Sequence, residues 1–340
     1  MEQKYGFISR KKNARTLDFD KYIPEFLMTK RLEKRSPKTI STYEQTLKQF
    51  KRFFDERSYS EMNADVMRDY IHYLTYEKKR WDDHPTSPIR EDGLSARSVN
   101  NVIRIMKVFF NYLKNENLIS SNPLKSVKYQ KQEKDTFEIF TDEDVIKLLE
   151  VPNKKLYTGF RDVCMMLVLI DTGLRIKELT NLKASDIDFK MRQITVRSSV
   201  SKTNTARNVP ISKRTCAELQ KLIEMINVES DDYVWLTQFG ERYFADTFAK
   251  MLKKYGKKAH ISGARVSPHT FRHYFAIKFL REGGNPMTLA RILGHTSLNM
   301  TQVYLKFTGS DLRDQHDIAS PVTSLFDKGN IKKSGKIRFK

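Results

Sequence analysis

The stretch IDFKMRQITVRSSVSKTNTARNVPI at residues 187–211 decides the fold class, because its apolar residues recur with a period of two. Such alternation is typical of a β-strand with one buried face. We expect three short antiparallel strands here, formed by IDF, QITVR and ARNVPI. Since the flanking sequence has a helical period, the chain is predicted to be mainly α with a small antiparallel β-sheet.

The segments on both sides of these strands predict helices with clear starts. Thr141 is placed to cap the helix DEDVIKLLE, and the apolar run CMMLVLI at 164–170 predicts a buried helix. The strands are followed by AELQKLIEMI and ERYFADTFAKMLKKYG, and then by three short helices that begin at Ser267-Pro268, Asn285-Pro286 and Ser297. We assign residues 139–310 to one domain.

The N-terminal half predicts a separate all-α domain. Ser36 and Pro37 start a helix, and Asn63 and Ser95 are placed to cap two more. The charged stretch NPLKSVKYQKQEKDT, which begins at residue 122, then breaks the helical period. We therefore predict a flexible basic arm at 1–18, a helical domain at 19–121, a linker at 122–138 and, after the second domain, a tail at 311–340.

Lys and Arg number 62 against 41 Asp and Glu, which gives a net charge of +21. A surplus this large predicts a polyanionic partner, most simply nucleic acid. No apolar run reaches the roughly 18 residues of a membrane span, so we expect no membrane association. The two cysteines, Cys164 and Cys216, lie in helical patterns and exclude a disulfide scaffold. Since the N-terminus has no secretory signal, a cytoplasmic protein is expected.

Residues suited to phosphodiester chemistry gather in the second half of the chain. Such a transfer requires cations around the non-bridging oxygens, an in-line nucleophile and an acid for the leaving oxygen. Arg175 and Arg272 offer forked donors for the phosphate, and Lys202 has the reach to protonate a leaving alkoxide. The blocks that carry these residues are TGLRIKEL at 172–179, VSKTNTARNVPI at 200–211, HTFRHYF at 269–275 and LGHTS at 293–297, followed by Tyr304.

Tyr304 is the candidate nucleophile. With a pKa of about 10, a tyrosine is only about 0.1 % phenolate at pH 7, so it needs a neighbouring base, and His269 and His295 are both available. His269 and His273 also share the spacing of two metal ligands on a helix. Because Thr270 stands where that motif requires Glu, we expect no metal.

The other residues also have ordinary structural interpretations. Arg175 can be a solvated helix residue that pairs with Glu178 three positions later. Lys202 is one lysine among many. A histidine that follows a glycine, as His295 does, often belongs to a helix cap, and Tyr304 can belong to an apolar helix face.

The order of the blocks resembles the tyrosine recombinase (phage-type integrase) family over about residues 139–310. The N-terminal half, which includes SPKTISTYEQTLKQFKRFF, resembles the core-binding, SAM-like domain of that family. The simple two-domain bacterial or mobile-element type fits best, because residues 1–18 are too few for a further domain. The family often has a glycine on each side of the hairpin lysine, where this chain has Ser201 and Thr203. The resemblance implies catalytic roles for Arg175, Lys202, His269, Arg272, His295 and Tyr304, with Glu178 in support.

The resemblance also implies a function, that of a site-specific DNA recombinase. Tyr304 would form a 3′-phosphotyrosyl link and release a 5′-hydroxyl, and the 5′-hydroxyl of a partner strand would reverse the step. Neither ATP nor a metal nor another cofactor is required. The family implies a two-domain, C-shaped clamp around double-stranded DNA and a homotetramer in the synaptic complex. The tail is expected to dock either on its own domain or on a neighbouring subunit.

Two other functions fit part of the sequence. One is a non-catalytic DNA-binding regulator on a recombinase scaffold, although such a protein has no use for Tyr304. The other is a type IB topoisomerase-like enzyme, although the N-terminal helical domain favours recombination. The sequence leaves open which DNA site is the target, and whether the task is integration and excision of a mobile element or resolution of DNA dimers.

Overall fold

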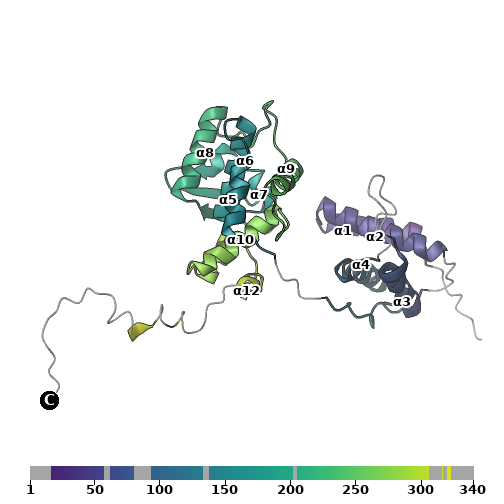
Figure 1. The fold of residues 1–340 in the computed structure, drawn as a ribbon. Helices are drawn as coiled ribbons and strands as arrows, with labels where there is room; N and C mark the ends of the chain where they lie inside the picture. The colour runs from purple at the N-terminus through teal and green to yellow at the C-terminus, as the bar shows by residue number, and fades with distance from the viewer. Residues whose placement is uncertain are drawn as a thin grey trace, which may run out of the picture. The chain divides into compact units, whose positions relative to one another are not determined.

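The computed structural model describes residues 17–56, 62–79, 93–132, 138–201, 205–305, 316 and 320–322. The chain divides into two compact units, residues 1–135 and 136–340. Figure 1 shows the first unit as helices in purple to dark blue and the second as helices and a small sheet in teal to yellow-green. Each unit is described by itself.

The described part of the first unit is all-helical, as the sequence predicts. Its helices are α1 (Phe19–Leu32), α2 (Pro37–Glu56), α3 (Ala64–His72), the π-helical segment η1 (Tyr73–Glu77) and α4 (Ala96–Asn115). Asn63 and Ser95 cap α3 and α4 with their side chains, which confirms both predicted starts. The core is aromatic: the ring of Phe19 lies edge-on to Phe50 with centroids 5.6 Å apart, which adds directional contacts to apolar burial.

Residues 122–130, which we predicted to belong to a linker, pack against α4. Leu124 and Val127 are buried in the core of the first unit. The side-chain amide of Asn100 donates to the Gln130 carbonyl at 2.9 Å and accepts from the Gln130 backbone N–H at 2.8 Å. Lys107 also donates to the Val127 carbonyl at 2.8 Å. The sequence did not indicate this packing, because the two apolar residues stand among many charged ones.

The second unit surrounds one buried helix. In chain order its elements are α5 (Asp142–Glu150), α6 (Tyr157–Thr172), α7 (Ile176–Leu179), η2 (Ala184–Asp186), β1 (Ile187–Asp188), β2 (Gln193–Val196), β3 (Arg207–Pro210), α8 (Lys213–Ile226), α9 (Ala245–Lys258), α10 (Pro268–Arg281), α11 (Pro286–Leu293) and α12 (Asn299–Leu305). Helix α6 holds the predicted apolar run and packs against α8 and α10. Thr141, Ser267 and Asn285 cap their helices as predicted.

The three predicted strands are confirmed. They form one antiparallel sheet in the order β1-β2-β3, in which Ile187 pairs with Ile194 and Ile194 with Val209. These three apolar residues share the buried face, as the period of two requires. Helix α9 begins at residue 245 rather than 241, because Tyr243 donates its backbone N–H to Trp235 and the chain is extended there.

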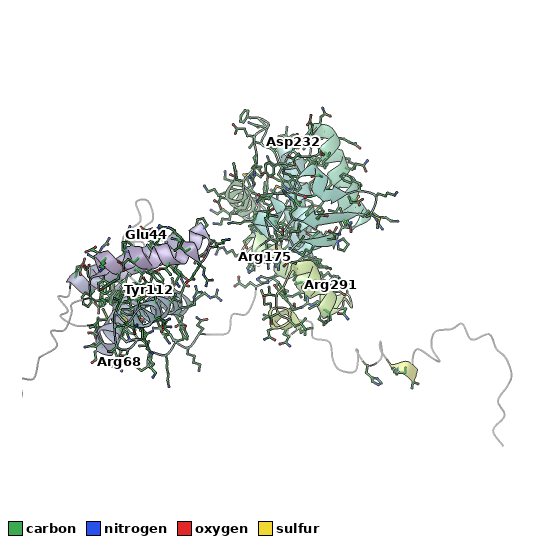
Figure 2. All side chains as sticks on the ribbon, turned by 180° about the vertical axis from the view of Figure 1, so that it is seen from behind. Glu44, Arg68, Tyr112, Arg175, Asp232 and Arg291 are labelled. Carbon is green, nitrogen blue, oxygen red and sulfur yellow. The ribbon has the colours of Figure 1, made fainter. Side chains whose placement is uncertain are left out.

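The second unit contains both cysteines of the chain. Cys164 and Cys216 are both buried and free. Figure 2 shows Arg175 and Arg291 toward one end of the unit and Asp232 at the other. Across the described part of the chain, no helix is both long and apolar enough to cross a membrane.

Candidate active site

Arg175 stands where helix α6 gives way to α7. The chain turns at Gly173, whose φ of 61° is left-handed, and Arg175 then precedes the first residue of α7. Its backbone N–H donates to Glu178 Oε2 and its Nη1 to Glu178 Oε1, both at 3.0 Å. The predicted pairing is therefore confirmed as a double contact that fixes both the backbone and the side chain of the arginine.

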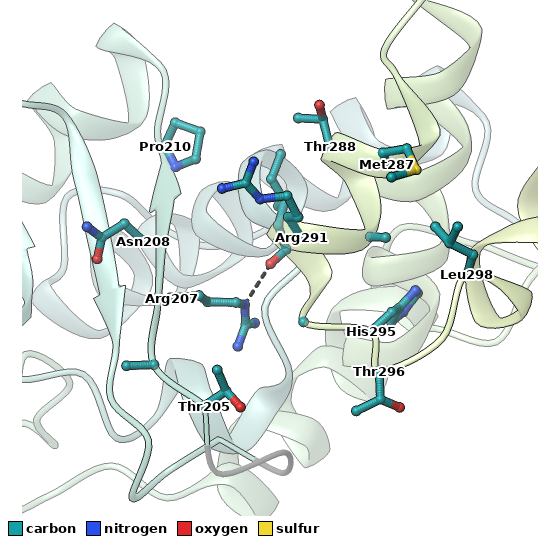
Figure 3. Close-up of a pocket in the computed structure, with 14 residues that line it drawn as sticks. Thr205, Arg207, Asn208, Pro210, Met287, Thr288, Arg291, His295, Thr296 and Leu298 are labelled. Atoms are coloured by element: carbon teal, nitrogen blue, oxygen red, sulfur yellow. Dashed lines mark hydrogen bonds between the residues drawn. The ribbon is translucent and has the colours of Figure 1, made fainter.

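Arg207, which the sequence analysis did not select, completes this ion pair. Its Nη1 and Nη2 donate to the two oxygens of Glu178 at 3.1 and 2.7 Å, and its Nε donates to the Ile292 carbonyl of α11 at 2.7 Å (Figure 3). Burial raises the pKa of Glu178, but the hydrogen bonds and charges of Arg207 and Arg175 outweigh burial and hold that pKa below its usual value. The sequence contained an indication of this contact. Arg207 lies two residues before buried Val209, so both side chains point to the same face of β3.

Arg272 lies on α10 and is almost fully buried, at 4 % exposure. It donates to the Gly173 carbonyl at 2.8 Å and to the Leu293 carbonyl at 2.9 Å. Arg175 also donates to the Leu293 carbonyl, at 3.3 Å, so the two guanidinium groups share one acceptor and lie side by side. Burial, reinforced by the charge of Arg175, lowers the pKa of Arg272 to about 10, and the group remains a cation at pH 7.

Tyr304 lies on α12 and is 5 % exposed. Its hydroxyl is 3.0 Å from Nδ1 of His273. Burial raises the pKa of Tyr304, while the charges of Arg272 and Arg175 oppose that shift. The predicted nucleophile therefore lies within the electrostatic field of both predicted arginines, and the histidine at its hydroxyl is one that the sequence analysis considered only for metal binding.

Three histidines surround these groups. The ring of His269 lies edge-on to that of His273, with centroids 4.3 Å apart, and His295 Nδ1 is 2.8 Å from the Thr301 hydroxyl. The His295 ring is parallel to that of Tyr304 within 11°. Burial is the main cause that lowers the pKa of all three histidines, and neighbouring arginine or histidine groups lower it further. The pKa of His273 and that of His295 fall to about 4. At pH 7 His273 and His295 are therefore neutral.

The structure brings together six of the seven predicted site residues: Arg175, Glu178, His269, Arg272, His295 and Tyr304. Lys202 lies in 202–204, outside the described residues, between β2 and β3. No cluster of three or more His, Cys, Asp or Glu side chains suited to a metal ion occurs within the described ranges.

A groove of about 790 Å³ opens beside this site, between β3 on one side and α11 with the loop that follows it on the other. Figure 3 shows Arg207 and Arg291 with His295 and Thr205 along its walls. An open groove that carries the exposed Arg291 beside Arg175 and Arg272 suits an extended polyanion rather than a small enclosed ligand.

Known protein families match both halves of the chain. Residues 138–309 match the phage integrase family and residues 18–131 match the phage integrase SAM-like domain. The chain belongs to the phage integrase family. It is a tyrosine recombinase, an enzyme of site-specific DNA recombination, and this assignment holds over the regulator and topoisomerase alternatives.

Two named relatives align with most of this recombinase. The tyrosine recombinase XerA of Pyrococcus furiosus is 30 % identical over 307 residues, which cover 89 % of this chain and 95 % of that protein. The tyrosine recombinase XerD of Listeria monocytogenes is 29 % identical over 286 residues, which cover 82 % of this chain and 91 % of that protein.

Solved structures share its fold. The Tn1549 transposon integrase in complex with transposon right end DNA is 18 % identical with a TM-score of 0.66, covering 87 % of this chain and 98 % of that one. XerH recombinase bound to a palindromic difH substrate is 18 % identical with a TM-score of 0.66, covering 88 % and 84 %.

Proposed function

We propose that this recombinase cuts and rejoins double-stranded DNA through a 3′-phosphotyrosyl bond on Tyr304. One observation carries the proposal: Arg175 and Arg272 share the Leu293 carbonyl as acceptor, and the charges of both act on the buried Tyr304 hydroxyl. Two adjacent guanidinium groups can each give forked donors to the non-bridging oxygens of one phosphodiester. The transferred phosphate would therefore lie against both arginines, with Tyr304 in reach of phosphorus.

The remaining residues have roles that follow from their contacts. Glu178 and Arg207 are positioning residues, because they hold Arg175 without facing the reacting atoms. His269 and His295 are proposed as donors to phosphate oxygens, and Thr301 contacts the ring of His295. Lys202 is proposed, from the family resemblance, to protonate the leaving 5′-oxygen. No step in this scheme requires a metal ion or ATP.

The larger assembly is also a proposal. The net charge of +21 supports binding to duplex DNA in the cytoplasm, and the family resemblance implies that the two domains close on the duplex as a C-shaped clamp. Four copies would form the synaptic complex, with the segment from 311 onward docking within or between subunits. Most of that segment lies outside the described residues. The task is integration and excision of a mobile element or resolution of DNA dimers.

The test is covalent capture with a randomised pool of nicked duplexes, in which a short strand diffuses away after cleavage. The wild-type protein should give a protein–DNA band on a denaturing gel, and sequencing of the captured duplexes should reveal the target site. Tyr304→Phe should abolish this band and leave the native gel shift nearly unchanged, because only the nucleophilic oxygen is lost.

Tyr274→Phe is the matched control. Tyr274 lies on α10 and donates to Asp142 at 2.8 Å, so its loss should leave the covalent band in place. A band that persists in Tyr304→Phe and disappears in Tyr274→Phe would move the nucleophile to Tyr274 and refute this assignment.

A further inference from the structure

The hydroxyl of Tyr304 faces a histidine to which the motif assigns no role. His273 follows Arg272 on α10, one helical turn after His269, and its Nδ1 is 3.0 Å from Tyr304 Oη. His273 is buried at 9 % exposure, and its ring centroid is 5.5 Å from that of Tyr304. The distance of 3.0 Å between Nδ1 and Oη corresponds to a direct hydrogen bond.

We propose that His273 is the base that accepts the proton of Tyr304 during attack on DNA and returns it when the bond is reversed. This inference rests on the proposed function. In the forward step the Oη–H bond breaks and the proton moves to Nδ1, while Oη forms a bond to phosphorus. The bond from phosphorus to the 5′-oxygen breaks, and its electron pair stays on that oxygen, which takes a proton from a separate acid, for which Lys202 is proposed.

The contacts of the other two histidines favour this assignment. His269 lies edge-on to His273, with centroids 4.3 Å apart. His295 contacts Thr301 through Nδ1, and its ring centroid is 6.4 Å from that of Tyr304. Of the three, His273 has the ring nitrogen that contacts Oη directly, which is the geometry that general-base catalysis requires.

The protonation state of His273 permits this role. Burial, followed by His269 and Arg272, lowers the pKa of His273 to about 4, so its imidazole is neutral at pH 7 and has a lone pair to receive a proton. An arriving phosphodiester brings a negative charge close to the ring, and a nearby negative charge raises the pKa of a histidine. The base therefore strengthens when the substrate is in place.

The test separates proton transfer from simple positioning. His273→Asn offers an amide oxygen that can accept the same hydrogen bond but cannot take a proton at neutral pH. Single-turnover covalent-complex formation is measured on the duplex captured by the wild-type protein, at saturating protein. We expect His273→Asn to be slower by about 10²-fold or more, the usual contribution of a general base. A change in DNA affinity is measured separately by gel shift.

A second substrate identifies the side of the reaction on which His273 acts. In this duplex, sulfur replaces the 5′-bridging oxygen at the scissile phosphate, so the leaving thiolate needs no acid. The slow rate of His273→Asn should persist with sulfur, because the defect lies in the nucleophile. Lys202→Ala is the matched control, and sulfur should restore its rate. Replacement of Tyr304 by 2,3-difluorotyrosine, whose hydroxyl is more acidic, should restore His273→Asn.

Three results would overturn the inference: an unchanged rate in His273→Asn, a faster rate, or rescue of its rate by sulfur. If the variant does not fold, the nitrogen-15 spectrum of histidine-labelled wild-type protein at pH 7 decides. An unprotonated Nδ1 on His273 supports the inference, and a protonated Nδ1, which cannot accept, refutes it. If Tyr304→Phe loses the covalent band and His273→Asn keeps the wild-type rate, only this inference is rejected. If the band persists in Tyr304→Phe, the proposed function is rejected.

Discussion

At the scale of single residues, Glu178 connects three elements. Its carboxylate is 1 % exposed and accepts from Arg175 before α7 and from Arg207 on β3, while Arg207 also reaches α11. A buried carboxylate is tolerated only while its charge is compensated and its oxygens are hydrogen-bonded. Glu178 therefore sets the position of Arg175 relative to the end of α11.

Arg207→Ala should destabilise the second unit by about 3–5 kcal/mol, because one partner of a buried ion pair is removed. Lys221→Ala is the control, since Lys221 is 62 % exposed in its pair with Glu218 and should cost less than about 1 kcal/mol. Urea denaturation of both variants measures the free energy of unfolding. Equal losses in the two variants would mean that water compensates Glu178.

The neutral histidines predict acid sensitivity. The pKa of His273 and of His295 is about 4 in the folded protein, against an ordinary value of 6.5. Between these pH values the unfolded chain binds more protons than the folded protein, so the free energy of unfolding falls as pH drops from 6.5 to 4. The stability that the neutral histidines contribute is complete above pH 6.5. We expect the two histidines together to lower the free energy of unfolding by about 2–4 kcal/mol between pH 7 and pH 5, measured by urea denaturation. The slope should flatten in His273→Asn; an equal slope in the variant would assign the acid sensitivity to other groups.

Much of the candidate site could be predicted from residue types in order, because forked cations and a hydroxyl nucleophile are recognisable in sequence. The contacts that arrange them could not. Arg207 contacts Glu178 and Ile292 because β3 lies beside α11, and His273 contacts Tyr304 because α12 packs against α10. Both sets of contacts depend on long-range packing. His273 was visible as a histidine one turn after His269, but its role depends on which residue α12 places at its Nδ1.

At the scale of elements, the end of α6 depends on Gly173. Its φ is 61°, and a Cβ there would lie 2.5 Å from the Phe275 ring and 2.8 Å from Leu293. Its carbonyl also accepts from Arg272. This one position therefore combines a left-handed turn, close packing and a contact to the active site.

Gly173→Ala should destabilise the second unit by about 2–5 kcal/mol, the sum of left-handed strain and overpacking. Gly240→Ala is the control, because Gly240 has a φ of 79° and open space around it, so that only strain of about 1–2 kcal/mol remains. Thermal or urea unfolding compares the two. If Gly173→Ala costs no more than Gly240→Ala, the neighbouring side chains move aside and the packing argument fails.

Elements with local signals were predicted well. The three strands follow from a period of two, and the starts of α3, α4, α5, α10 and α11 follow from capping residues, because both signals lie within a few neighbouring residues. The start of α9 was wrong by four residues, since residues 241–243 pair with a segment near Trp235 instead of joining the helix. The packing of 122–130 was missed because two apolar residues among many charged ones carry little periodicity.

At the scale of the whole molecule, we expect the charge of +21 to govern DNA affinity. Lys332, Lys333 and Lys336 lie outside the described residues, and we predict that they contact phosphates. Replacing all three by Gln should weaken binding to every sequence and reduce the slope of log affinity against log salt by roughly 0.9 for each lost contact. Single-turnover cleavage at saturation should stay near normal. Normal binding combined with failed cleavage would instead place the tail in assembly or in the organisation of the active site.

The short helix α12 carries two parts of the reaction centre on one face. Tyr304 is the proposed source of the nucleophilic oxygen, and Thr301, one turn earlier, contacts His295. When α12 leaves its place, the nucleophile and the restraint on His295 leave with it. In the proposed mechanism, an incompletely docked helix would give an inert enzyme instead of one that nicks DNA and releases a broken end, so the arrangement would act as an interlock.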